Sequence, residues 1–107
     1  MSTDTENVLA ELGSKIGRLQ TLEYETEKRA KKRGDGFSEA RHNCEWISKL
    51  IKFAGAGRKL EWVEGSIDDL QDPDFQSEQL IGVPPHIINH AIALAKQAIA
   101  NQTPATV

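Results

Sequence analysis

The sequence predicts an all-α protein, a small helical bundle built on a long antiparallel helical hairpin, with a C-terminal amphipathic helix and an irregular acidic connector. Three observations support this fold class: an extensive apolar helical pattern over residues 37–54, a heptad-like pattern near the start of the chain, and an amphipathic pattern near its end. A chain of 107 residues is the usual size of one domain. It can bury roughly two thirds of its unfolded surface. We therefore expect one helical domain over residues 1–107.

The stretch 37–54 is the predicted centre of the bundle. Its apolar residues recur with alternating steps of three and four, which places them in one stripe along a helix. A second stripe of Trp46, Leu50 and Phe53 lies beside the first. Together the stripes exceed the ~100° apolar face of a surface helix, so this helix needs neighbours on at least two sides. The residues of the first stripe are Phe37, Ala40, Cys44, Ile47, Ile51 and Ala54.

The first predicted helix covers residues 4–33. Its apolar residues, Leu9 to Leu22, have a heptad-like spacing that ends at Glu23, and the rest of the helix is almost entirely charged. The break Gly34-Asp35-Gly36 predicts an antiparallel hairpin with the central helix. We expect ~45 Å for the first helix and ~27 Å for the central one, so about a third of the first has no partner in the chain. A symmetric dimer through this end or through the Leu9–Leu22 stripe would cover it; a monomer with a protruding arm is the alternative.

The remaining chain is predicted as a connector and a last helix. Residues 58–83 form the acidic connector, with one short helix that begins with Ser66 as its cap. The last helix, 85–101, has an alanine-rich face suited to close packing on the central helix. Residues 102–107 form a flexible tail because they show no packing signal.

The charges of the chain are segregated, although the net charge is only −3. Residues 28–59 contain ten Lys and Arg against three acids, whereas residues 61–78 contain seven acids and no base. Such asymmetry indicates separate basic and acidic surfaces.

The acidic segment, with its aromatic residues Trp62 and Phe75, is the predicted partner-binding surface. Trp anchors many protein interfaces, and the acids would steer a basic partner surface toward them. In the alternative interpretation, both aromatic side chains pack in the core and the acids only solvate the connector. The candidate residues are Glu61, Trp62, Glu64, Asp68, Asp69, Asp72, Asp74 and Phe75.

For function, the sequence favours a non-enzymatic protein-binding module, a small adaptor or inhibitor. Phage- and plasmid-encoded inhibitors of host machinery are often of this size and acidity. The main alternative is a nucleic-acid-binding accessory protein, because clustered Lys and Arg bind phosphates. Its candidate residues are Lys28, Arg29, Lys31, Lys32 and Arg33, with Arg58 and Lys59.

The third class is a small helical nucleotide pyrophosphatase of the MazG type. Such enzymes hold magnesium with an ExxE pair that faces a second pair, whereas Glu61-Trp62-Val63-Glu64 is the only ExxE in this chain. We therefore predict no catalytic, cofactor-binding or metal-binding residue. His86 and His90 are expected to be surface residues, since metal binding needs further ligands.

No apolar run approaches the ~18 residues of a membrane span, and the first residues are acidic where a signal peptide would be basic and then apolar. We therefore expect a cytoplasmic protein without a membrane anchor. Cys44 is the only cysteine and lies in the apolar stripe, so its expected role is core packing.

Overall fold

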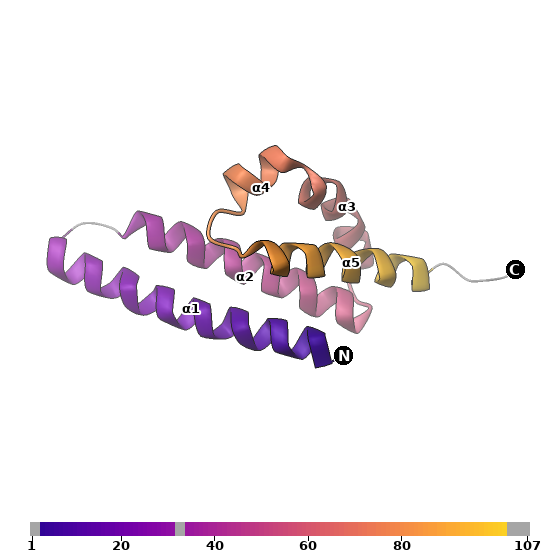
Figure 1. The fold of residues 1–107 in the computed structure, drawn as a ribbon, viewed down its shortest axis with the longest axis horizontal. Helices are drawn as coiled ribbons and strands as arrows, with labels where there is room; N and C mark the ends of the chain where they lie inside the picture. Colours follow the sequence, from indigo (N-terminus) through magenta and orange to yellow (C-terminus); the bar gives the residue numbers. More distant parts are fainter. Residues whose placement is uncertain (1–2, 32–33, 103–107) are drawn as a thin grey trace, which may run out of the picture.

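The computed structural model describes residues 3–31 and 34–102, which form five helices and no strand (Figure 1). The prediction of an all-α helical bundle is confirmed. Lys32, Arg33 and residues 103–107, which include most of the predicted tail, lie outside the described residues. The helices are α1 (Thr3–Ala30), α2 (Asp35–Ala56), α3 (Leu60–Gln71), α4 (Pro73–Gln79) and α5 (Pro85–Gln102).

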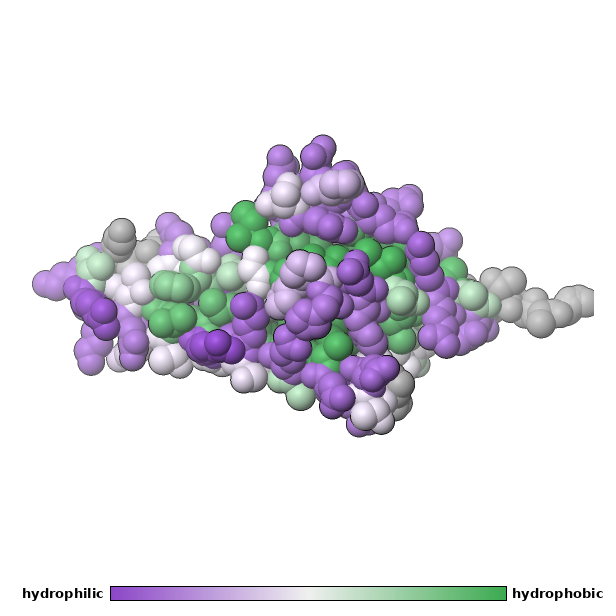
Figure 2. Space-filling view, viewed as in Figure 1, coloured by the Kyte–Doolittle hydropathy of each residue, from purple (hydrophilic) through white to green (hydrophobic). Residues whose placement is uncertain are grey.

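Helix α2 is the centre of the bundle, because α1, α3 and α5 all pack against it. Both predicted stripes face these neighbours. Trp46 and Phe53 of the second stripe are half-buried, and Phe37 at the start of the first is also half-buried. Figure 2 shows hydrophobic side chains gathered along the middle of one face and hydrophilic ones over α4. The buried residues of α2 are Ala40, Cys44, Ile47, Ser48, Leu50, Ile51 and Ala54.

Helices α1 and α2 lie side by side and run in opposite directions (Figure 1). Leu12 is fully buried against the core. Further along α1, the carboxylate of Glu23 accepts hydrogen bonds from Arg41 Nε at 2.7 Å and from Ser38 Oγ at 2.6 Å. From residue 24 to residue 30 only Thr26 is half-buried and the other side chains are exposed, so the charged end of α1 faces solvent. A dimer through this end stays a prediction.

The acidic connector is more regular than predicted, because residues 60–71 and 73–79 are helical. Val63, Ser66 and Leu70 are buried at helical spacing, so α3 packs an inner face on the bundle. Ser66 does not cap a helix; its hydroxyl donates to the Trp62 carbonyl at 2.9 Å inside α3. Helix α4 begins instead at Asp72, whose side chain accepts a hydrogen bond from the Asp74 amide at 3.0 Å.

Helix α5 packs on α2, as predicted, and also on α3. Because it has two neighbours, α5 buries side chains toward both, and Ile87 in its first turn is fully buried as well. Polar contacts join α5 to α1 as well. His90 Nε2 lies 3.1 Å from Thr5 Oγ1, and His86 Nε2 lies 3.0 Å from the Glu11 carboxylate. In the part of the chain that is described, no helix is both long and apolar enough to cross a bilayer.

The turn between α4 and α5 contacts the first half of α2. Asn43 Nδ2 donates to the Ile81 carbonyl at 2.9 Å, and Gly82 follows with φ +90°. A Cβ atom at Gly82 would lie 2.5 Å from the Cβ of Ala40, closer than side-chain atoms approach one another. Only glycine fits here, for both its backbone conformation and its close approach.

We predict that Gly82→Ala lowers the free energy of unfolding by about 1–3 kcal/mol, because it combines overpacking with an unfavourable backbone angle. Urea titration followed by circular dichroism measures this change. Gly13→Ala in α1 is the matched control, since a Cβ there meets nothing within 4 Å. It should raise stability by up to about 1 kcal/mol. Equal effects of the two substitutions would contradict the close approach at Gly82.

A second prediction concerns Glu23. Hydrogen bonds from Arg41 and then from Ser38 lower the pKa of this carboxyl to about 2. A carboxyl whose folded pKa lies below its unfolded value stabilises the fold above the unfolded pKa of about 4.3, and this contribution is lost as the pH falls toward the folded value. The stability difference between the wild type and Glu23→Gln should therefore shrink on acidification through this range. Urea titrations at a series of pH values test it; a constant difference would contradict the pairing.

Candidate functional site

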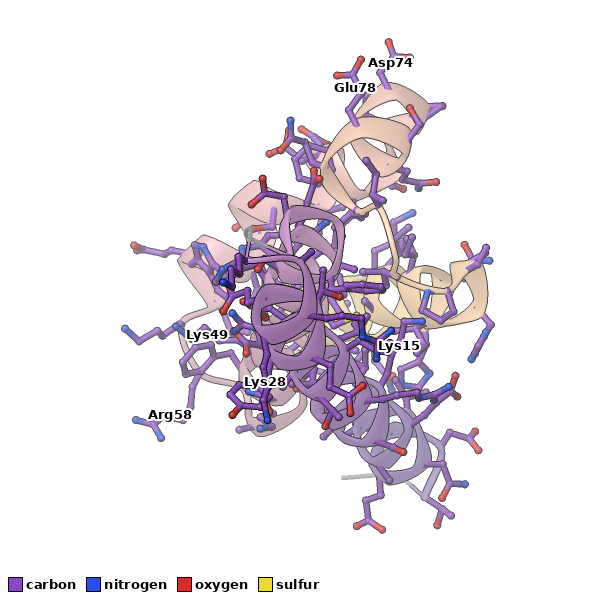
Figure 3. The ribbon with its side chains drawn as sticks, turned by 90° about the vertical axis from the view of Figure 1, so that its left-hand side faces the viewer. Lys15, Lys28, Lys49, Arg58, Asp74 and Glu78 are labelled. Atoms are coloured by element: carbon purple, nitrogen blue, oxygen red, sulfur yellow. The ribbon has the colours of Figure 1, made fainter. Side chains whose placement is uncertain are left out.

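Seven carboxylates lie on the outer side of α3 and α4, six on the helices themselves and one on Asp72 between them, and we call them the acidic face. All seven side chains are exposed. Figure 3 shows Asp74 and Glu78 on the outer side of α4, pointing away from the hairpin. Residues 60–79 contain no Lys, Arg or His. Within the described residues, none of the seven carboxylates forms an ion pair with a cation. The acidic face consists of Glu61, Glu64, Asp68, Asp69, Asp72, Asp74 and Glu78.

The two aromatic residues predicted for this surface point inward and are half-buried. Trp62 and Phe75 both contact Trp46 of α2, with ring centroids 6.0 and 6.2 Å apart. Trp62 also meets Phe53 at 5.8 Å, edge to face. These four rings, which we call the aromatic row, join α3 and α4 to α2. The structure therefore brings Trp62 and Phe75 together beneath the acidic face, and packing is part of their role.

The predicted basic residues are not gathered into one patch. Lys28, Arg29 and Lys31 lie at the end of the hairpin near the α1–α2 connection, whereas Arg58 and Lys59 follow the opposite end of α2. Since α2 has 22 residues, about 30 Å separates the two groups. Lys32 and Arg33 lie outside the described residues.

Two open depressions that the sequence analysis did not predict lie along α2. One, of about 410 Å³, is lined by Lys49, Lys52 and Phe53 together with Ile16, Glu45 and Ser48. The other, of about 480 Å³, is lined by Trp46, Lys49, Phe53, Lys59 and Trp62. Because Lys49 and Phe53 line both, the depressions adjoin. A usable signal was present in the sequence: Trp46, Lys49 and Phe53 recur at steps of three and four, which places them on one face of a helix.

The ExxE pair, His86 and Cys44 lie on three different helices. Glu61 and Glu64, the ExxE pair, are both exposed on α3. His86 is exposed and faces Glu11, and Cys44 is fully buried. Burial raises the pKa of the Cys44 thiol, which disfavours the thiolate. In the described ranges no three or more His, Cys, Asp or Glu side chains form a cluster that could hold a metal ion.

Comparisons of the chain with protein-family models, with curated proteins and with solved structures give no match. The charges and contacts of the molecule itself are therefore the basis for its function.

We predict that Trp46→Ala lowers the free energy of unfolding by about 2 kcal/mol, because the ring contacts both α3 and α4 from α2. Chemical denaturation measures the loss. Tyr24→Ala is the control, since Tyr24 is 64% exposed. Its stability should stay within about 0.5 kcal/mol of the wild type. If Trp46→Ala is as harmless as the control, the aromatic row does not hold α3 and α4 in place.

Proposed function

We propose that the protein is a non-enzymatic protein-binding module, an adaptor or inhibitor, that docks on a basic protein surface through the acidic face. The observation that supports this most is the set of seven exposed carboxylates on two consecutive helices and the residue that joins them, none of them paired with a cation in the described residues. Carboxylates held close together repel one another, and a basic surface relieves that repulsion on contact.

The carboxylates also have a firm support, which a docking surface requires. The inner faces of α3 and α5 share the core cluster of α2, and the aromatic row holds the outer helices on α2. Little conformational entropy is lost when groups that are already in place meet a partner. We therefore assign recognition to the carboxylates and support to Trp62 and Phe75.

A cytoplasmic location is part of this proposal. The single thiol, Cys44, is buried and forms no disulfide, so the fold needs no oxidising compartment. The symmetric dimer remains a separate prediction, which the oligomeric state in solution would test.

We predict that Asp68→Lys/Asp69→Lys weakens binding of the protein partner by at least about tenfold, because attraction becomes repulsion at the middle of the acidic face. Partners captured from a lysate of the source cells at low and high salt are identified first, and their affinities are then measured with purified proteins. Both residues are exposed, so the fold should be retained, which circular dichroism checks.

The matched control is Glu25→Lys/Glu39→Lys, which changes the net charge equally at two exposed positions on α1 and α2. It should keep the affinity within a factor of about three, since only distant, screened charges change. A photoreactive side chain at Glu64 should crosslink the partner, and one at Lys96 on α5 should not. Equal loss in both double variants, or crosslinking only from Lys96, would contradict the proposed surface.

A further inference from the structure

The two adjoining depressions form a continuous surface of cations and aromatic rings, which we call the lysine groove. It runs along α2 between α1 and α3. Lys49 and Lys52 extend from α2 one helical turn apart, and Lys59 lies where α3 begins. Figure 3 shows Lys49 and Arg58 on one side of the molecule, with Lys15 on the opposite side and Asp74 and Glu78 on the outer side of α4.

The cations of the groove are not neutralised by the protein. Three lysines line the depressions, Lys49, Lys52 and Lys59, and Arg58 directly precedes Lys59 in the chain. All four side chains are exposed, and none forms an ion pair in the described part of the chain. Glu45, the acid that lines one depression, accepts a hydrogen bond from Arg41 Nη1 at 2.9 Å, so its charge is already paired. Lys59 Nζ lies 5.7 Å from the centroid of the Phe53 ring. An anionic ligand would therefore meet available positive charge along the groove.

The rings of the groove are partly accessible. Trp46, Phe53 and Trp62 are half-buried and line the same depression as Lys49 and Lys59. Aromatic rings that alternate with cations in an open groove fit a ligand with flat, apolar groups on an anionic backbone. Single-stranded nucleic acid has this chemistry, because its unpaired bases stack on aromatic side chains while its phosphates contact Lys and Arg.

The surroundings favour one strand over two. Glu61 directly precedes Trp62 in α3, and further exposed carboxylates of the acidic face follow along this helix, so negative charge lies beyond the groove on that side. The second strand of a duplex would bring its phosphates toward these carboxylates, and the bases of a duplex are stacked on one another and unavailable to the rings. An acidic peptide would also pair with the lysines. It could stack on the aromatic rings, however, only where its own sequence contains an aromatic residue.

We propose that the lysine groove is a binding site for single-stranded nucleic acid, with bases against Phe53 and Trp62 and phosphates at Lys49, Lys52, Arg58 and Lys59. This site does not depend on the proposed function, since its cations lie outside the acidic face and its ligand is a different one. It also differs from the basic site predicted from the sequence, because Lys49, Lys52 and the three rings form its centre.

Binding can be measured by the intrinsic tryptophan fluorescence of the protein. Its two tryptophans, Trp46 and Trp62, both line the groove. Titration of the full chain with a (dT)20 or (rU)20 oligonucleotide at low salt should quench their emission as bases stack. With four phosphate contacts on a single strand, the affinity should fall roughly 50-fold between about 50 and about 200 mM salt.

The test variant is Lys49→Glu/Lys52→Glu, which should weaken oligonucleotide binding by at least about tenfold and reduce the salt dependence. The control is Lys15→Glu/Lys96→Glu, which makes the same change of charge away from the groove and should bind within a factor of about three of the wild type. Phe53→Leu keeps an apolar side chain but removes a ring, so it should weaken binding with the salt dependence unchanged. Circular dichroism confirms that each variant is folded.

Three results would overturn the site or its ligand. Absence of quenching and of binding at low salt removes the site, as does equal weakening in both charge-reversal variants. Tighter binding of a duplex of the same length, or of an acidic peptide rich in Glu and Tyr, would show that single strands are not the ligand. The acidic-face variant Asp68→Lys/Asp69→Lys should still bind the oligonucleotide, so failure of this proposal and failure of the proposed function are distinguishable.

Discussion

The burial of α2 on several sides is the constraint on which the rest of the structure depends. Successive residues of a helix point about 100° apart around its axis. On this basis the buried side chains of α2 and those of its second apolar stripe cover an arc of about 220°, from Phe53 at one edge to Ser48 at the other. One neighbour covers about 100°, so α1, α3 and α5 are all required. Because Ile47, Leu50 and Ile51 are fully buried within that arc, loss of any neighbour would expose part of the core. The positions of α3 and α4, and therefore of the acidic face, follow from this requirement.

Polar contacts then select one arrangement among those that apolar stripes alone would allow. Leu and Ile can pack in more than one register, whereas a carboxylate that accepts from a guanidinium group has few good geometries. Glu23 meets Arg41 through two nitrogen atoms, at 2.7 and 3.4 Å, and this pair fixes how far along α2 the charged half of α1 lies. On a neighbouring face of α2, Gly82 lies against Ala40, and this close contact fixes the position of the start of α5.

The sequence predicted the long helices well because their apolar period is repeated over many residues. It missed the length of α3, since Leu60, Val63 and Leu70 are spaced among acids and Gly65, and Ser66 resembles a cap although its hydroxyl bonds to Trp62 within the helix. The residues of the acidic face could be identified from the sequence, because a run of acids without bases is expected to be exposed wherever the chain folds. The environment of Trp62 could not be predicted, as it depends on Trp46, which is distant in sequence and close only in the fold.

Helix α3 belongs to both candidate surfaces, and this has an electrostatic consequence. Its Trp62 lines the lysine groove, while Glu61, which directly precedes it, and Glu64, two residues further on, belong to the acidic face. At physiological salt, charges interact over about 8 Å, so an anion in the groove is repelled by these nearby carboxylates. If a basic partner docks on the acidic face, as proposed, it neutralises them and thereby favours the anion. Linkage requires the reverse effect to be equally large: an anion in the groove favours the basic partner. The two surfaces are therefore expected to cooperate when both are occupied, and this coupling through charge requires no change of conformation.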